Sequence, residues 1–208
     1  MSTDTEAPAA PAPSIADPAP LGLAGFALTT FLLSAVNAHW ATSSSGSDWL
    51  GYAFAYGGIG QLLAGMWEFK NKNVFGATAF STYGGFWIGL YFWVQDVAPH
   101  TTGLQANRDL GWILLAFAIF NTYMLIVSTQ LNMAVFAVFI TLEITEILLF
   151  IGQFTITASD GGTNTLIKIG GIVGVITALC AWYTSAAGVM NGIKGRPVFP
   201  VGKPLFNL

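Results

Sequence analysis

Charged residues are scarce in this 208-residue chain, where only 8% of the residues are Asp, Glu, Lys or Arg. A soluble domain carries about 25%, so the charges are too few to cover a water-facing surface. The formal net charge of −3 is small, and no run of Lys and Arg is present that could follow a phosphate backbone. The composition therefore excludes an ordinary soluble domain and argues against a nucleic-acid partner.

Cysteine and histidine are almost absent, with one Cys and two His in the chain. Cys180 lies in an apolar stretch, which favours a buried thiol, and it has no partner for an internal disulfide. His39 and His100 form no H-x-x-H pattern, and no C-x-x-C pair occurs. Because an enzyme needs clustered nucleophiles, bases or metal ligands, we expect no enzyme, no metal site and no cofactor.

Hydrophobic residues, in contrast, make up 54% of the chain, and the mean hydropathy is +0.64. A membrane helix needs about 20 consecutive, mainly apolar residues. We therefore expect an all-α integral membrane protein, its six transmembrane helices covering residues 21–41, 49–67, 74–94, 109–129, 133–154 and 166–191. The short connections predict antiparallel neighbours within one domain, residues 17–193.

The two ends of the chain are expected to be tails. Residues 1–16 are rich in Ala and Pro and lack the basic and apolar regions of a secretory signal, so we expect them to be disordered. Residues 194–208 form the second tail. Lys and Arg mark the cytoplasmic side of a membrane protein. With six spans, the side that holds both tails carries Lys70, Lys72, Lys194, Arg196 and Lys203, and the other carries Arg108 and Lys168. We therefore expect both tails in the cytoplasm and the protein in the plasma membrane.

The first expected helix opens with the motif "DPAPLGL", residues 17–23. Pro18 and Pro20 suit a first helical turn, where an N–H group would lack a partner in any case, and Gly22 completes the motif. The free N–H groups at such an end can attract an anion. The Asp17 carboxylate can equally cap them itself, and the spacing fits both interpretations.

Polar side chains recur along the first two expected helices. Phe26, Thr30 and Asn37 stand at i, i+4 and i+11, which places them on one helix face. Gln61 lies near the middle of the second span, where an unpaired amide is costly. Such side chains either line a solute path or bond to neighbouring helices.

Two stretches resemble the acetate uptake transporters, a family of bacterial succinate–acetate permeases and fungal ammonia/acetate exporters. "DPAPLGLAGFALTT" is similar to the N-P-A-P-L-G-L signature, with Asp17 in place of its asparagine. "AYGGIGQLLAGMWEFKNKNVFGATAFSTYGGFW" is similar to the second and third helices of the family with their loop. The resemblance implies six-helix protomers in a hexamer, each with its own pore. It also implies channel-like or proton-coupled transport of acetate and small monocarboxylates, with succinate in some members.

The resemblance further implies a hydrophobic constriction made by Phe26, Tyr83 and Leu142, with Ala181 shaping the size of the substrate. Two acids that are not general features of the family, Glu143 and Glu146, stand beside it. Ionised groups in mid-membrane are rare, so either these acids handle protons, at least one of them being neutral at pH 7, or they join helices or subunits. The alternatives are a channel for another solute such as ammonia, or a structural or signalling membrane protein without a solute path.

Overall fold

The computed structural model describes residues 15–41 and 48–206, and every regular element in that part of the chain is helical. The disorder expected for residues 1–16 falls almost wholly outside the described residues. Four long helices are α1 (Ala19–Asn37), α5 (Gln105–Ser128), α6 (Met133–Thr155) and α7 (Thr165–Lys194). One composite segment joins α2 (Leu50–Tyr52), the π-helix η1 (Ala53–Gly60) and α3 (Gln61–Lys70). The other joins α4 (Val74–Phe92), the π-helix η2 (Trp93–Val97) and the 3₁₀ turn η3 (Ala98–His100), and a further 3₁₀ turn, η4 (Ala158–Asp160), precedes α7.

Asparagine side chains set the starts of three helices. The Oδ1 atoms of Asn73, Asn132 and Asn164 accept hydrogen bonds of 3.0–3.1 Å from backbone N–H groups in the first turns of α4, α6 and α7. Each bond satisfies one of the donors that a helix start leaves free, which stabilises the helix by about 1 kcal/mol. These caps explain why α4, α6 and α7 begin within a residue of the expected positions.

Both ends of α1 differ from the expected span of residues 21–41. The helix begins at Ala19, whose backbone N–H donates to Asp17 Oδ1 at 3.0 Å, so the carboxylate caps this end. It stops at Asn37, four residues earlier than expected, because His39 adopts the left-handed conformation with φ 62°. The N–H of Trp40 then bonds to the carbonyl oxygen of Ala35 at 2.9 Å and closes the helix.

The second expected span also needs a correction, because it is not a uniform α-helix. Residues Ala53–Gly60 are π-helical, and only α3 continues in α-helical form to Lys70. At its end the Glu68 side chain is fully buried and accepts hydrogen bonds of 3.0 Å from the side chains of Asn71 and Asn73. This carboxyl group therefore ties the end of α3 to the start of α4.

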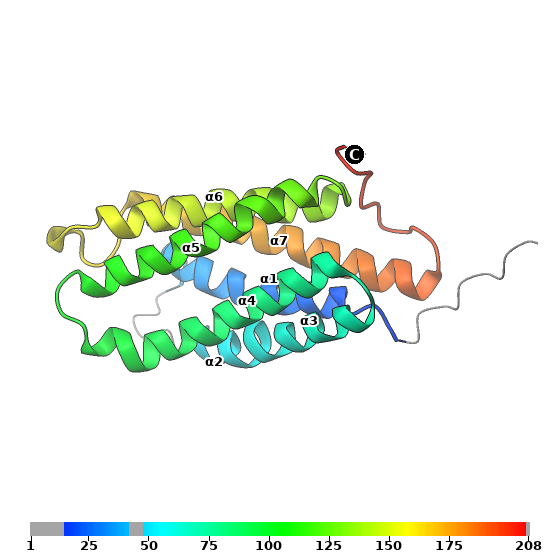
Figure 1. Cartoon of the computed structure of the whole chain (residues 1–208). Coiled ribbons are helices and arrows are strands. Elements are labelled where there is room, and N and C mark those ends of the chain that lie inside the picture. Colours follow the sequence, from blue (N-terminus) through cyan, green and yellow to red (C-terminus); the bar gives the residue numbers. More distant parts are fainter. Residues whose placement is uncertain (1–14, 42–47, 207–208) are drawn as a thin grey trace, which may run out of the picture.

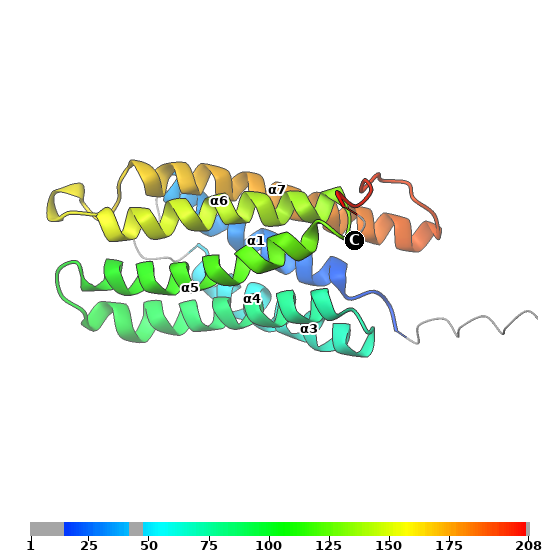
Figure 2. The same cartoon turned by 45° about the horizontal axis from the view of Figure 1, so that its top comes forward.

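The helices lie lengthwise in one elongated bundle (Figures 1 and 2). Helix α1 runs through its interior, with α7 on one side and η1, α3 and α4 on the other. Small residues allow the close approaches: a Cβ atom on Gly84 would stand 2.7 Å from the backbone nitrogen of Leu62, and one on Gly174 would overlap Ser34. Small residues allow such backbone contacts between membrane helices.

Within the described residues, α1, α5, α6 and α7 are long and apolar enough to cross a bilayer. Side chains on the outer face of α5, including Trp112, Ile119 and Ile126, are more than 60% exposed in the single chain. Such a surface suits contact with lipid and not with water. The chain is therefore a multi-pass membrane protein.

The C-terminal tail folds back along the bundle after Gly195, where φ is 61° and α7 ends. The side chain of Asn191 accepts bonds from the N–H groups of Val198 and Phe199 at 2.7 and 2.9 Å. Further along, the N–H of Leu205 donates to the carbonyl oxygen of Thr129 at 2.8 Å. These bonds attach the tail first to the end of α7 and then to the turn between α5 and α6.

Candidate functional site

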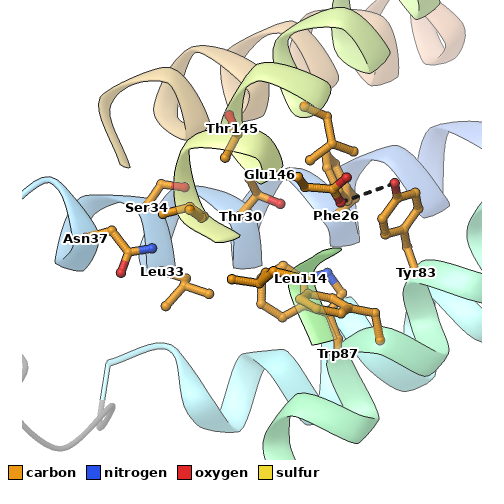
Figure 3. A pocket seen from close by; sticks show the side chains of 13 residues that line it. Phe26, Thr30, Leu33, Ser34, Asn37, Tyr83, Trp87, Leu114, Thr145 and Glu146 are labelled. Carbon is orange, nitrogen blue, oxygen red and sulfur yellow. Dashed lines mark hydrogen bonds between the residues drawn. The ribbon is translucent and has the colours of Figure 1, made fainter. Parts of the chain in front are cut away.

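A cavity of about 50 Å³ lies between α1, α4, α5 and α6 (Figure 3). This volume is enough for a few water molecules or a small solute. Its lining includes Phe26, Thr30 and Asn37 of α1, Tyr83 and Trp87 of α4, and Leu142 and Glu146 of α6. The face of α1 expected from the spacing i, i+4, i+11 therefore borders this cavity.

One end of the cavity is closed by large apolar side chains. Phe26, Tyr83 and Leu142 are each at most 6% exposed and share one buried cluster with Ala181. The ring of Phe26 meets that of Tyr83 edge to face, with 5.7 Å between centroids. Figure 3 shows these two rings at one end of the cavity and Asn37 at the other. The structure thus brings together the four residues for which the resemblance implies a constriction and a size filter.

A second cavity, of about 80 Å³, adjoins the first. The two share the lining residues Leu33, Asn37, Phe86, Leu114 and Leu149. The second continues to Trp49, Trp93 and Gln153. Together the cavities form a row of spaces that runs from the ends of α4 and α6 to the rings of Phe26 and Tyr83, with Asn37 where they meet.

A network of hydrogen bonds lies behind the Tyr83 side of the first cavity. Its centre is Asn121 of α5, which is fully buried and was not predicted. The Tyr83 hydroxyl donates to Asn121 Oδ1 at 3.0 Å, and it lies 3.4 Å from Glu146 Oε1. Asn121 Nδ2 and the Thr122 hydroxyl each donate to a different oxygen of Glu143 at 2.7 Å. The two acids of α6 therefore occupy different environments, and only Glu146 borders the cavity.

Three polar atoms in the lining of the first cavity are buried and have no hydrogen-bond partner in the part of the chain that the structure describes. They are Thr30 Oγ1, Trp87 Nε1 and Glu146 Oε2, which come from three different helices. A buried polar group without a partner costs about 1–3 kcal/mol. A polar solute in the cavity would satisfy these groups, which gives the space the chemistry of a binding site.

Gln61 lies elsewhere in the bundle. It is 1% exposed and its Oε1 has no hydrogen-bond partner, but it is not part of the lining of either cavity. Its face of α3 is buried, since Ala64 and Glu68 one and two turns later are fully buried as well. That Gln61 meets the solute stays a prediction.

The helix-start motif lies apart from the two cavities. Asp17 and Pro20 line a groove of about 570 Å³ between the start of α1 and the end of α7. The hydroxyl of Ser185 on α7 donates to the carbonyl oxygen of Pro20 at 2.6 Å. Pro18 provides the carbonyl that accepts the bond from the N–H of Gly22 at 3.2 Å. The motif therefore joins α1 to α7.

The sequence belongs with known transport proteins. Residues 2–201 match the GPR1/FUN34/yaaH family. The chain is a member of this family. The match confirms the resemblance that its two motifs indicate.

Among the described residues, no group of three or more His, Cys, Asp or Glu side chains could hold a metal ion.

Relatives in fungi and bacteria carry transport names. Acetate permease A of Emericella nidulans is 37% identical over 195 residues, which cover 89% of this chain and 65% of that protein. The succinate-acetate/proton symporter SatP of Escherichia coli K12 is 33% identical over 189 residues, covering 91% of this chain and 96% of that protein. This chain spans less than two thirds of the length of several fungal relatives that it matches. The names of acetate permease A and of the symporter SatP describe transport and not enzymatic catalysis.

A solved structure has the same fold. The bacterial acetate channel SatP superposes with a TM-score of 0.81 at 33% sequence identity, covering 91% of this chain and all of that chain. The likeness at this identity shows that this chain shares the helical fold of that protein.

Proposed function

We propose that this chain transports acetate and related small monocarboxylates across the membrane through its two adjoining cavities. Succinate is a further candidate substrate. The observation that carries the proposal is the row of spaces that ends at Phe26, Tyr83 and Leu142. Its relationship to proteins named as an acetate permease, a symporter and an acetate channel supports the substrate class.

The chemistry of the path suits a small amphiphilic solute. Its lining is mainly aromatic and aliphatic, with isolated polar groups at Asn37, Thr30 and Glu146. A short carboxylic acid places its methyl group against the apolar wall and its oxygens against the polar groups.

Six membrane crossings are part of this proposal, with α2–η1–α3 and α4 as the second and third. Figure 1 supports the even number: the start of α1, the turn from α3 to α4 and the end of α7 lie at one end of the bundle. Lys70 belongs to the end of α3 and Lys194 to the end of α7, so the basic residues gather at that end. By the rule for basic residues, this end and both tails, residues 1–16 and 194–208, face the cytoplasm, with the protein in the plasma membrane. The apolar outer face of α5 would contact lipid and the other protomers of a homohexamer. Each protomer would have its own path.

Flux into liposomes tests the proposal. Purified protein is reconstituted, and uptake of labelled acetate is measured against protein-free liposomes, which report passive entry of acetic acid. Saturable uptake that succinate or unlabelled acetate inhibits is the expected result. Wild-type uptake equal to that of empty liposomes would refute transport of acetate.

The same liposomes distinguish a channel from a proton symporter. Moving an anion against 100 mV, negative inside, costs about 2.3 kcal/mol per charge, and a proton that travels with it removes this cost. An imposed potential should therefore alter uptake through a channel, and a pH gradient should drive accumulation through a symporter.

Ammonia is the second candidate solute, because the Saccharomyces cerevisiae protein named ammonia transport outward protein 2 is 39% identical over 188 residues, covering 86% of this chain and 64% of that protein. A pH-sensitive dye inside the liposomes reports ammonia entry as alkalinisation. Alkalinisation faster than in empty liposomes, without acetate uptake, would favour this candidate.

A further inference from the structure

Three unpaired polar atoms converge on the first cavity from different helices: Thr30 Oγ1 from α1, Trp87 Nε1 from α4 and Glu146 Oε2 from α6. Their residues are only 3–6% exposed. Figure 3 shows the three side chains around the same space. Buried polar atoms normally have partners, so three without one around a single cavity indicate a site for a polar ligand.

Two of these groups can act as donors to a ligand. The indole N–H of Trp87 can only donate. Thr30 is distinguished by comparison with its neighbour Thr29, whose hydroxyl donates to the carbonyl oxygen of Gly25 at 2.9 Å. The Thr30 hydroxyl has no such bond to its own helix, so its proton is available to the cavity.

The contacts of the two acids differ in how well they would stabilise a negative charge. Both oxygens of Glu143 accept short bonds, from Asn121 and Thr122 at 2.7 Å, which is the environment of a carboxylate. Among the described residues, Glu146 has only the Tyr83 hydroxyl as a side-chain partner, at 3.4 Å, and that hydroxyl is closer to Asn121 Oδ1. An ionised Glu146 would therefore keep an unpaired charge in a buried, apolar wall. In its neutral form it instead presents an O–H group to the cavity.

The titratable groups around Glu146 are few. Tyr83 faces it from α4, and Glu143 stands one turn away on α6 behind Asn121 of α5. Cys180 of α7 packs against the buried cluster that contains Tyr83 and Leu142. Helix α1 presents Phe26 and Thr30, neither of which titrates. No described Lys or Arg lines this cavity to compensate a charge on Glu146.

We propose that Thr30, Trp87 and neutral Glu146 form a binding subsite for the carboxylate group of the transported solute, in which Glu146 donates a hydrogen bond from Oε2. The inference rests on the proposed function, since it names where and how that solute is held. Three converging donors favour an anion rich in acceptors. The methyl group of acetate then faces Phe26 and Leu142 in the same lining. Ionised Glu146 would lose its donor and repel the ligand, so binding weakens as the pH rises.

The pH dependence of acetate uptake tests the role of Glu146. Uptake into liposomes is measured from pH 6 to pH 9 at a fixed concentration of acetate anion, for the wild type and for Glu146→Gln. The substitution conserves shape and keeps a donor, but it cannot ionise. Wild-type uptake should fall with pH more steeply, by up to about tenfold per pH unit, which is the limit for one proton. The supply of undissociated acid falls equally for both proteins, so the difference between the profiles isolates Glu146.

Two further variants complete the test. Trp87→Phe keeps an aromatic ring but removes the N–H, and it should raise the acetate concentration for half-maximal uptake about tenfold. Asp109→Asn is the matched acid-to-amide control, because Asp109 lies at the start of α5, bonded to Gln105 and outside the cavity. It should keep the wild-type pH profile. All variants are compared by elution volume, so that misfolded protein is recognised.

Each outcome gives a decision. Superimposed profiles for the wild type and Glu146→Gln would overturn the donor role of Glu146, and an unchanged half-saturation in Trp87→Phe would overturn the subsite. A changed profile in Asp109→Asn would show that the pH dependence arises outside the cavity. Absence of acetate uptake by wild-type protein would overturn the proposed function, and with it the ligand assigned here, whereas active but insensitive variants would overturn the subsite alone.

Discussion

Replacement of Phe26 by Ala tests whether the apolar end of the first cavity selects solutes by size. The ring is 5% exposed and packs edge to face on Tyr83, with centroids 5.7 Å apart and an interplanar angle of 62°. It comes from α1, whereas its partners come from α4 and α6. Removing it widens the narrow end without cutting a hydrogen bond, so we expect larger monocarboxylates such as lactate to pass.

The expected change in selectivity can be sized from the packing. One additional methylene in a tight apolar pocket is worth about 1–3 kcal/mol, or 10–200-fold in rate. Loss of the ring should therefore lower the ratio of acetate flux to lactate flux by about tenfold or more. Truncation of a buried Phe also costs about 3–5 kcal/mol of stability, and the lower end applies here because part of the ring faces a cavity.

The assay is competitive flux of labelled acetate and lactate into liposomes, at a temperature where the variant elutes as a folded protein. Phe31→Ala is the matched control, because Phe31 lies on the same helix and does not line the cavity. Its ring packs against that of Trp182, with 5.4 Å between the ring centroids. It should lower stability without altering the flux ratio. An unchanged ratio in Phe26→Ala, or an equal change in both variants, would refute the reasoning.

Three further predictions concern the fold. Gly84→Ala should destabilise the detergent-solubilised protein by about 1–3 kcal/mol, because the new methyl group overpacks against the backbone of α3. Gly85→Ala is the control and should be neutral or slightly stabilising, because nothing lies within 4 Å of its Cβ position. Equal denaturation midpoints for the two variants would contradict this prediction. Asn191→Ala should free the C-terminal tail and speed its cleavage by proteinase K, with acetate flux as the control for an intact bundle. Two hydrogen bonds from Thr157 lower the pKa of Asp160. This carboxylate should therefore stabilise its turn at neutral pH and stop doing so as the pH falls through that lowered pKa. Amides in the turn that are equally protected from hydrogen exchange in strong acid would argue against this prediction.

Apolar run lengths in the sequence predicted the helical stretches well, because a membrane helix must be both long and apolar. Two details depended on local backbone geometry instead. The left-handed turn at His39 ends α1 early, although no glycine marks the position. The π-helix Ala53–Gly60 packs against α1 and α4, and a periodicity of 3.6 residues does not indicate such an element.

The candidate site shows the same division. Spacing placed Phe26, Thr30 and Asn37 on one face of α1, and that face borders the cavities. The same reasoning found a buried face for Gln61, but periodicity shows only that a face is covered and not which neighbour covers it. Asn121 was missed, although a lone amide in the apolar stretch "LLAFAIFNTYML" was a usable signal.

The two acids of α6 show why the chemistry of the path needed the structure. Spacing places Glu146, four residues after Leu142, nearer the face of Leu142 than Glu143, but it does not show which of the two acids receives hydrogen bonds. An ionised carboxylate about 4 Å from an acetate anion costs about 4 kcal/mol at an effective dielectric constant of 20, which corresponds to about a thousandfold slower passage. Asn121 and Thr122 hold Glu143 behind the wall and supply the donors that a carboxylate needs. Glu146 receives no comparable donors and borders the cavity, so the acid that meets the solute is the one whose surroundings favour its neutral form.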